Sequence, residues 1–492
     1  MSCGSTNTSN SAPLMLHCAK SIMSRYIFVA IENDAGASLF QHRLARYAAF
    51  TNDWNRVNFA SGSSVQTGGA YCAAVNRGVD FVGDAFLAVT AKGLKLEAGT
   101  GANSFRQNNV LGSNTATNLT KSVVDGSELQ SAAAANAVRQ VTTQKGRTSL
   151  QAWAQAADAY GAYVPFVGQM FWSSVKVKIG NTQLSAYNGN SLLAFSQLMP
   201  LNNGENASLS LCPVPVSGAG YFDFGAWEEL CSRDQEFFVP LPFAGANPSK
   251  SFPSVTASYQ PLEVEVQTEA LNNLVLANAA SDNVTLASGA ALSDSNTFSG
   301  AYLLYNAIYV DAMEKDMQLA KDRDFILPYH DHHKTSLQVA AGTSQTVNLR
   351  GKYLCYGILV NVDVAAASQG VAGLSCAADY TGPLKSLALN LSSSVHQSHE
   401  GNVASMVVPS SSGFLSSANK ESNYYMFALG LNGADTLTTN QAQGAVNLSK
   451  VDSLSMDLVF NANVSGTANI HITYLSLAVA RCIKNVMAMA YL

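Results

Sequence analysis

The sequence predicts an all-β protein built from two consecutive β-sandwiches, with short helices and long inserted loops. Three observations support this prediction. Hydrophobic residues make up 47% of the 492 residues, which is enough to fill more than one large core. Short segments of alternating apolar and polar residues recur in both halves of the chain, and turn-forming residues separate them. Residues 271–299 lack this alternation and carry almost no charge, so they are expected to link the two sandwiches.

The composition argues against several classes of protein. The formal net charge is -5 and no cluster of Lys and Arg residues offsets it locally, so direct binding to nucleic acid is not expected. No apolar run reaches the roughly 18 residues that a membrane-spanning helix needs, and residues 1–20 lack the pattern of a secretion signal. The eight cysteines are widely spaced without a C-x-x-C pair, which is typical of buried thiols in a protein made in a reducing compartment.

The first half opens with a polar arm at residues 1–40, in which residues 26–31 favour a short strand. Residues 46–60 then place aromatic side chains among polar ones, which is typical of a sandwich strand. Residues 79–90 predict a further strand interrupted by a glycine. Residues 91–160 are rich in Gly, Asn, Ser and Ala. They are expected to form an insertion between strands that either has a function of its own or is an addition to the fold without one.

The clearest strand and turn signals of the first half lie between residues 163 and 266. Residues 163–184 contain strict alternation followed by Gly180 and Asn181, a pair that predicts a tight hairpin turn. Residues 237–243 form an apolar run with two prolines, which belong at the edge or the end of a strand. In residues 252–266 the alternation of Leu and Val with Glu indicates a strand with one buried face.

The second half begins with an apolar strand segment at 300–312, followed at 313–323 by residues that favour a helix. A regular series of strand candidates then runs to the end of the chain, with turn signals between them. These segments are 349–364, 384–391, 406–409, 424–431, 451–460 and 469–480.

Motifs at several of these positions occur in an order that is found in one known family. They are Val239 to Phe243, then Phe252, Pro253, Ala257 and Tyr259, then Tyr309, Asp311 and Glu314, then Phe427 to Leu429 with Asn447 to Lys450, and the closing residues 485–491. In these motifs the chain resembles the double jelly-roll major capsid proteins of nucleocytoplasmic large DNA viruses. It departs from their pattern at Leu448 and Lys450, where the family has Phe and Arg, and in the glycines missing from the closing segment.

The resemblance implies two eight-stranded jelly rolls, the first over residues 41–270 and the second over residues 300–492. It also implies a structural protein without enzymatic activity or cofactors. Three copies would form a pseudo-hexagonal capsomer, and many capsomers would tile an icosahedral shell of a large double-stranded DNA virus. The implied partners are copies of the chain itself, minor capsid and penton proteins and, indirectly, an internal viral membrane. The implied location is the virion capsid, after synthesis in the host cytoplasm.

Two clusters of polar residues raise the question of a chemical site. His330, Asp331, His332 and His333 carry the side chains that zinc prefers, but neighbouring residues of a strand point to opposite faces. We therefore interpret them as a polar turn between helix and strand rather than as a metal site. His396 and His399, in a Ser-rich segment expected to be a loop, are weaker candidates.

The second cluster is the pair Asp80 and Asp84, whose carboxylates are of the kind that serves acid-base catalysis. Their spacing around Gly83 fits a β-bulge and turn hydrogen bonds better. We therefore assign no catalytic, cofactor-binding or metal-binding residue.

An alternative function is that of a β-sandwich surface protein that binds carbohydrate or hydrolyses glycosides. Its candidate residues would be Trp227, Glu228 and Glu229. A glycosidase needs two carboxylates about 5 to 9.5 Å apart, whereas neighbouring Glu residues on a strand diverge. The motif resemblance favours the capsid interpretation.

Overall fold

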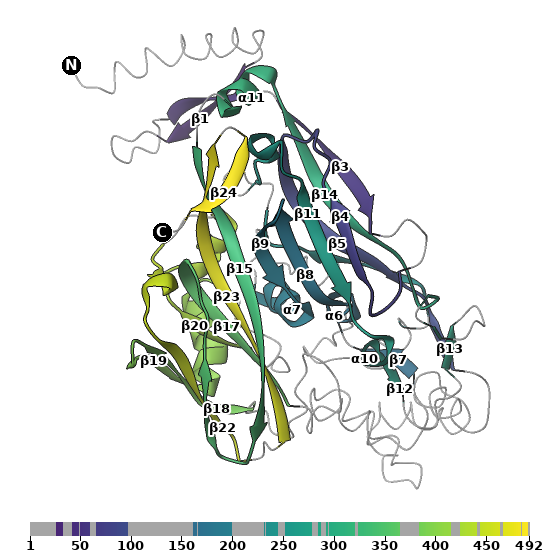
Figure 1. Cartoon of the computed structure of the whole chain (residues 1–492), viewed down its shortest axis with the longest axis vertical. Helices are drawn as coiled ribbons and strands as arrows, with labels where there is room; N and C mark the ends of the chain where they lie inside the picture. Colours follow the sequence, from purple (N-terminus) through teal and green to yellow (C-terminus); the bar gives the residue numbers. More distant parts are fainter. Residues whose placement is uncertain are drawn as a thin grey trace, which may run out of the picture.

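The computed structural model contains two β-sandwiches that lie side by side, with their long strands running in similar directions (Figure 1). It describes residues 26–32, 42–48, 50–59, 65–96, 161–164, 166–198, 231, 233–244, 251–277, 284–286, 292–293, 295–319, 323–364, 383–414, 424–439, 443–462, 466–483 and 485–490. The candidates Trp227, Glu228 and Glu229, and most of the insertion at 91–160, lie outside these residues.

The first sandwich consists of two four-stranded antiparallel sheets. One sheet has the order β10-β5-β14-β3, with β10 (Gln235–Pro240), β5 (Phe81–Ala91), β14 (Phe298–Val310) and β3 (Phe50–Asn58). The facing sheet has the order β4-β11-β8-β9, with β4 (Ala70–Ala74), β11 (Leu262–Thr268), β8 (Trp172–Ile179) and β9 (Thr182–Tyr187).

Short helices and small two-stranded sheets surround the first sandwich. The helices are α6 (Val167–Met170), α7 (Gly189–Leu198), the 3-10 helix η3 (Ser254–Ala257), α10 (Leu271–Leu274) and α11 (Ala312–Leu319). The small sheets pair β1 (Tyr26–Glu32) with β2 (His42–Ala48), β6 (Leu94–Leu96) with β13 (Val284–Leu286) and β7 (Gly161–Tyr163) with β12 (Val275–Ala277).

The second sandwich repeats the architecture. One sheet has the order β15-β23-β17-β20, with β15 (Arg323–Val339), β23 (Gly466–Ile483), β17 (Leu354–Val364) and β20 (Tyr424–Ala428), and it also carries β21 (Val446–Asn447) and β24 (Val486–Ala490). The other has the order β16-β22-β18-β19, with β16 (Ser344–Asn348), β22 (Leu454–Phe460), β18 (Leu384–Leu391) and β19 (Ser394–Glu400). Its helices are the π-helical turn η4 (Val403–Val407), α13 (Val408–Ser411), α14 (Gly433–Thr439) and the 3-10 helix η5 (Leu448–Lys450).

The two sandwiches have the same strand order, which establishes the fold. When the eight main strands of each are counted along the chain, one sheet contains the first, eighth, third and sixth strands, and the other contains the second, seventh, fourth and fifth. Two Greek keys that place eight strands in two facing sheets form a jelly roll. The chain is therefore a double jelly roll, and the predicted all-β fold class is confirmed.

The division between the jelly rolls differs from the expected one. We expected the strand at 300–312 to open the second jelly roll, but β14 pairs with β3 and β5 and completes the first. Its inward-facing Leu303 lies opposite Leu87 of β5 and Val57 of β3, so it closes the core of the first sandwich. The segment around α11, rather than residues 271–299, therefore connects the two jelly rolls.

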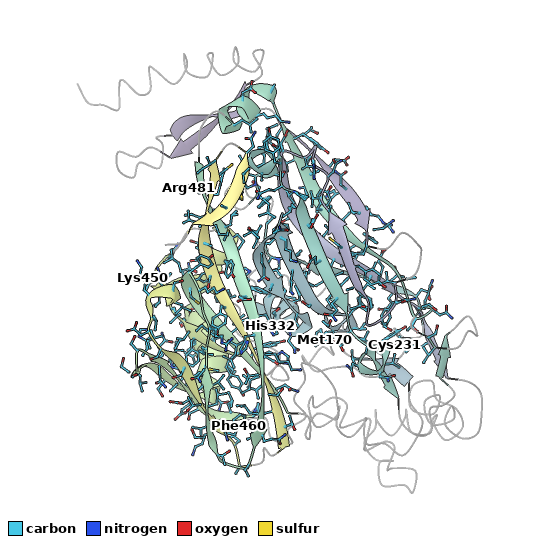
Figure 2. The ribbon with its side chains drawn as sticks, in the orientation of Figure 1. Met170, Cys231, His332, Lys450, Phe460 and Arg481 are labelled. Atoms are coloured by element: carbon cyan, nitrogen blue, oxygen red, sulfur yellow. The ribbon has the colours of Figure 1, made fainter. Side chains whose placement is uncertain are left out.

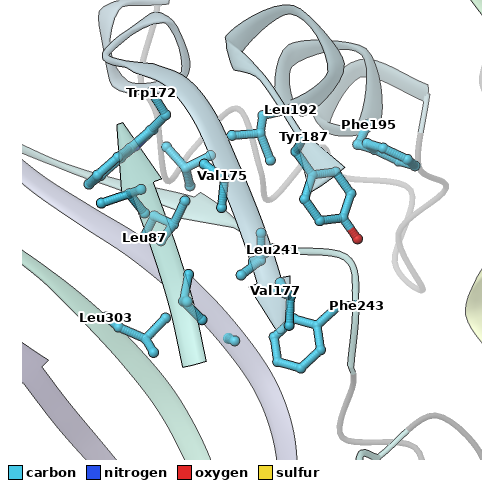
Figure 3. Close-up of a cluster of buried hydrophobic side chains, with 14 of the residues drawn as sticks. Leu87, Trp172, Val175, Val177, Tyr187, Leu192, Phe195, Leu241, Phe243 and Leu303 are labelled. Carbon is cyan, nitrogen blue, oxygen red and sulfur yellow. The ribbon is translucent and has the colours of Figure 1, made fainter. Parts of the chain in front are cut away.

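The core of the first jelly roll forms between its two sheets (Figure 3). Val175 and Val177 of β8 face Leu87 of β5 and Leu303 of β14, and all four are buried. The hairpin predicted at Gly180 and Asn181 is present: β8 and β9 pair across it, and Gly180 has a φ of +54°, a value that glycine adopts without strain. Alternation in the sequence thus identified the inward face of this sheet correctly.

Three local predictions in the second jelly roll are wrong. Residues 406–409 form part of η4 and α13 instead of a strand, because Pro409 cannot donate to a ladder and occupies the first turn of a helix. The histidines at 330–333 lie inside the 17-residue strand β15 rather than in a turn, since β15 pairs with β23 along its whole length. His396 and His399 lie in strand β19, which pairs with β18.

Candidate functional site

A buried polar seam joins the two jelly rolls. It is formed by β9 and α7 of the first jelly roll and by β15, β17, β20 and β23 of the second, and Figure 2 shows His332 between the two sandwiches. Hydrogen bonds cross it: the Ser185 hydroxyl donates to the carbonyl of Pro328 over 3.1 Å, and the Tyr424 hydroxyl donates to the carbonyl of Asn190 over 3.0 Å. The seam thus fixes the two jelly rolls relative to each other.

His330 is fully buried in this seam, with 0% of its surface exposed. Its Nδ1 atom lies 3.0 Å from the hydroxyl of Tyr187 in the first jelly roll, and its Nε2 atom lies 3.4 Å from the hydroxyl of Tyr356 in the second. Its ring also packs against Phe195 of α7 at a centroid distance of 5.0 Å. Burial raises the pKa of the Tyr187 phenol, so this residue stays a neutral hydrogen-bonding group. His330 therefore acts as a structural bridge between the jelly rolls.

His332 stacks on His471 of β23, with the ring centroids 5.5 Å apart. The Nε2 atom of His332 lies 3.3 Å from Nδ1 of His471, and the amide nitrogen of Asn188 lies 3.2 Å from the same Nδ1 atom. Burial lowers the pKa of His332 to about 4 and that of His471 to about 3, with further lowering by nearby positive charge. Both imidazoles are therefore neutral near pH 7.

The three histidines of β15 do not converge on one point. His330 and His332 point towards the seam, whereas His333 lies on the opposite face and its Nε2 atom contacts the Thr335 hydroxyl at 3.1 Å. Within the residues that the structure describes, no group of three or more His, Cys, Asp or Glu side chains is arranged to hold a metal ion. Sequence reasoning named His330 and His332 but missed their partners, because Tyr187, Asn188 and His471 are far away along the chain.

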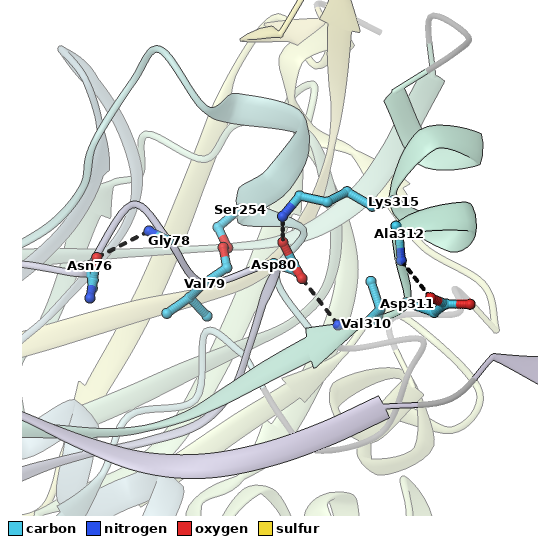
Figure 4. A network of polar contacts seen from close by, with 9 residues as sticks. All are labelled: Asn76, Gly78, Val79, Asp80, Ser254, Val310, Asp311, Ala312 and Lys315. Atoms are coloured by element: carbon cyan, nitrogen blue, oxygen red, sulfur yellow. Dashed lines mark hydrogen bonds and ion pairs between the residues drawn. The ribbon is translucent and has the colours of Figure 1, made fainter. Parts of the chain in front are cut away.

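Asp80 has a structural role at the start of β5 (Figure 4). Its Oδ2 atom accepts the backbone N–H of Val310 over 3.0 Å, and its Oδ1 atom forms an ion pair with Nζ of Lys315 at 2.5 Å. Asp84 lies where the register of β5 and β14 shifts between Val82 and Ala85, as the bulge interpretation predicted. The Asp80 carboxylate is thus occupied in joining β5, β14 and α11.

An open hollow of about 340 Å³ lies on the outer face of the β4-β11-β8-β9 sheet. Tyr71, Lys176 and Glu265 are among its lining residues. Glu265 forms an ion pair with Lys178 at 2.5 Å and so is held by a neighbouring cation. Glu265 is the one carboxylate among the lining residues, whereas glycoside hydrolysis requires two.

Apolar side chains are exposed on the outer face of the other sheet of the first jelly roll. Trp54 of the edge strand β3 is 48% exposed and packs on Phe86 of β5 at a centroid distance of 5.9 Å. The guanidinium of Arg56, also on β3, lies 3.8 Å from the ring centroid of Tyr302. We call this surface, with Phe50 and Phe238, the outer aromatic face. Sequence reasoning missed it, because alternation does not reveal whether the second face of a strand is covered.

The cysteines fit the interpretation of isolated thiols. Cys72, Cys231, Cys355 and Cys482 are all free, and the last three are buried. Burial raises the pKa of the Cys355 thiol to about 12, which keeps it protonated and unreactive.

No helix within the described ranges is both long and apolar enough to span a membrane.

Comparisons with known proteins identify the fold at low sequence identity. No family model and no curated protein sequence matches the chain. Its structure is similar to that of VP54 of the virus PBCV-1, with a TM-score of 0.59 and 13% identity over 92% of this chain and 100% of the viral protein. The Faustovirus major capsid protein is similar with a TM-score of 0.59 and 12% identity over 90% of this chain and 92% of that protein. The chain therefore has the fold of the double jelly-roll major capsid proteins of large DNA viruses.

Proposed function

We propose that the chain is a major capsid protein that assembles as trimeric, pseudo-hexagonal capsomers into the icosahedral shell of a large double-stranded DNA virus. The observation that carries this proposal is the fold similarity, which extends over both jelly rolls and over the full length of VP54. Two sandwiches with the same strand order in one chain suit a trimer with six similar lobes. Its role is structural rather than catalytic.

The outer aromatic face provides surface that such assembly can bury. Exposed apolar patches that are rimmed by polar residues are typical of protein interfaces, and Trp and Arg are enriched at their centres. Here the Trp54 side chain is held by Phe86, and Arg56 is held over Tyr302. Side chains that are already ordered lose little conformational entropy when a partner covers them. We propose that a second copy of the chain covers this face in the capsomer.

Edge strand β3 gives a second reason for this assignment. It forms one edge of its sheet, and most of its residues are exposed on both sides of the strand. An exposed edge strand with apolar residues promotes association with other chains unless it is covered. Coverage in a closed, symmetric capsomer satisfies this requirement and prevents open-ended growth.

The remaining partners follow from the proposed role. In the virion, neighbouring capsomers, minor capsid and penton proteins would contact the trimer, and an internal viral membrane would be linked through such proteins. Direct binding to the genome is not proposed, since the chain has a net charge of -5. Synthesis in the host cytoplasm agrees with the four free cysteines.

The mass of the undenatured protein tests the proposal. Light scattering after size-exclusion chromatography should give about three times the chain mass of 51.9 kDa, and negative-stain images of the same peak should show hexagonal particles. A stable monomer whose melting temperature rises on addition of oligosaccharides would contradict the proposal and favour the carbohydrate-binding alternative. The oligosaccharides should be tested against buffer with an equal mass of glycerol as the control.

A further inference from the structure

The hydrogen-bond directions in the seam can be assigned from the contacts of Asn188. Asn188 precedes helix α7, and its Oδ1 atom accepts the backbone N–H of Ser191 over 2.9 Å, as in a helix N-cap. The amide nitrogen of Asn188 therefore faces His471, where it lies 3.2 Å from Nδ1. An amide N–H₂ group can only donate, so Nδ1 of His471 must be an acceptor.

The same argument determines the state of His332. Its Nε2 atom lies 3.3 Å from Nδ1 of His471 and must carry the proton, because the facing nitrogen is an acceptor. The one lone pair of His471 Nδ1 is thus shared by two donors in a three-centre hydrogen bond, one donor from the first jelly roll and one from β15. A proton bound at this atom would face the amide donor of Asn188, so the hydrogen bond between the two jelly rolls at this point would be lost.

Among the side chains that the structure describes beside the pair, the charged neighbour on the same face is positive. Lys334 lies directly opposite His471 in the β15–β23 ladder and on the same face, and its charge lowers the pKa of both histidines. Tyr424 of β20 lines the same crevice as His471, and the phenols Tyr187 of β9 and Tyr356 of β17 face His330.

Helix α7 and Asp331 complete the described surroundings of the pair. Helix α7 has no titratable residue. Asp331 is adjacent to His332 in sequence, but it points to the other face of β15, where Lys352 and His333 are its charged neighbours.

We infer that His332, His471 and Asn188 form an acid-sensitive lock between the two jelly rolls, closed while both imidazoles are neutral and opened by their protonation. Protonation of His471 converts the shared acceptor into a donor and places positive charge in a buried seam, on the same face as Lys334. Burial, and after it nearby positive charge, lowers the pKa of both histidines in the closed seam. The inference concerns the contact within one chain and does not depend on the proposed assembly.

Hydrogen exchange of the full-length protein tests the lock. Backbone amides of β9, α7 and β15 report on the seam, and those of β18 and β22, in the distant sheet of the second jelly roll, serve as an internal reference. After correction for the intrinsic effect of pH, protection at the seam should fall about tenfold or more between pH 7 and pH 4.5, while the reference keeps its protection. Equal protection of the seam at both pH values would overturn the inference.

Two variants separate the lock from general acid sensitivity. The double variant His332→Gln, His471→Asn keeps a donor and an acceptor near the original positions but cannot be protonated, so the seam should stay protected at pH 4.5. The control His396→Asn changes an exposed histidine on β19 and should behave as the wild type does. The same acid-induced loss in the double variant would contradict the inference.

A milder substitution covers the case in which the double variant does not fold. Lys334 is exposed, so Lys334→Glu should leave the fold intact. A carboxylate opposite His471 would raise the pKa of the two histidines in the closed seam towards that of free histidine. Acidification would then shift the equilibrium between the closed and the open seam by less. The loss of seam protection at pH 4.5 should become smaller than in the wild type. An unchanged or larger loss would argue against the lock.

Discussion

Asp80 and Lys315 form an ion pair of 2.5 Å that joins the start of β5 to helix α11, the connector between the two jelly rolls. The Asp80 side chain is 5% exposed and that of Lys315 is 42% exposed, so the pair lies at the boundary of the core. The second oxygen of Asp80 accepts the N–H of Val310 at the end of β14. One buried carboxylate thus fixes three elements where the chain leaves the first jelly roll.

Replacing Asp80 should therefore destabilise this junction. Asp80→Ala leaves the N–H of Val310 without its acceptor and removes the ion pair, and we expect a loss of about 1 to 3 kcal/mol in unfolding free energy. Thermal unfolding followed by circular dichroism would measure the loss. Asp324→Asn is the matched control, because its pair with Arg481 is exposed on both sides and should contribute little. A larger effect of the control would refute the structural role of Asp80.

Truncation of the first core should have a larger effect. Leu87 of β5 is fully buried between the two sheets, and Leu87→Ala should lower the unfolding free energy by about 2 to 5 kcal/mol through lost burial and the cavity left behind. Val395→Ala on β19, where the side chain is 65% exposed, should change it by less than about 0.5 kcal/mol. Urea titration of both variants would test the expected order.

The stability of the protein should decrease in mild acid. The pKa values of His332 and His471 are lowered on folding, so their stabilising effect is complete above pH 6.5 and is lost as pH falls towards about 4 and about 3. For each histidine, the unfolding free energy then falls by up to about 1.4 kcal/mol for every pH unit of acidification. Burial raises the pKa of Asp331. Protonation of this carboxylate at low pH therefore favours the folded state, which is opposite to the effect of the two histidines.

Melting temperatures between pH 7 and pH 4.5 would measure this dependence. The carboxylates with lowered pKa values, Asp234, Asp324 and Asp457, lose their contribution only below this window, since their ordinary pKa is 3.8. The double variant His332→Gln, His471→Asn should show a flatter profile than the wild type. A steeper profile in the variant would exclude the two histidines as its cause.

Assembly should depend on the outer aromatic face. Trp54→Ser removes a large, ordered side chain from this face and should raise the dissociation constant of the proposed trimer about tenfold or more. Sedimentation velocity over a range of concentrations would measure it. The melting temperature of the monomer should change little, because Trp54 is half exposed. Thr51→Ala on the same strand is the control, since Thr51 lies on the opposite face. An unchanged dissociation constant in the Trp54 variant would show that the outer aromatic face is not part of the interface.

Sequence alone was sufficient for the class of fold and for much of its local structure. Alternation of apolar and polar residues is a local property, so the hairpin around Gly180 and the strands β11, β18 and β22 could be located from it. The family motifs added the double jelly roll, which the strand order confirms. The bulge near Asp84 also followed from a local signal, the glycine within a strand.

Pairing between distant segments was decided by the tertiary structure. The alternation in β14 is compatible with either sandwich, and only its register with β3 and β5 assigns it to the first. The histidines of β15 gained their roles from Tyr187, Asn188 and His471, which lie about 140 to 145 residues away from them along the chain. Burial and hydrogen bonding depend on such long-range contacts, and a sequence pattern describes only neighbours along the chain.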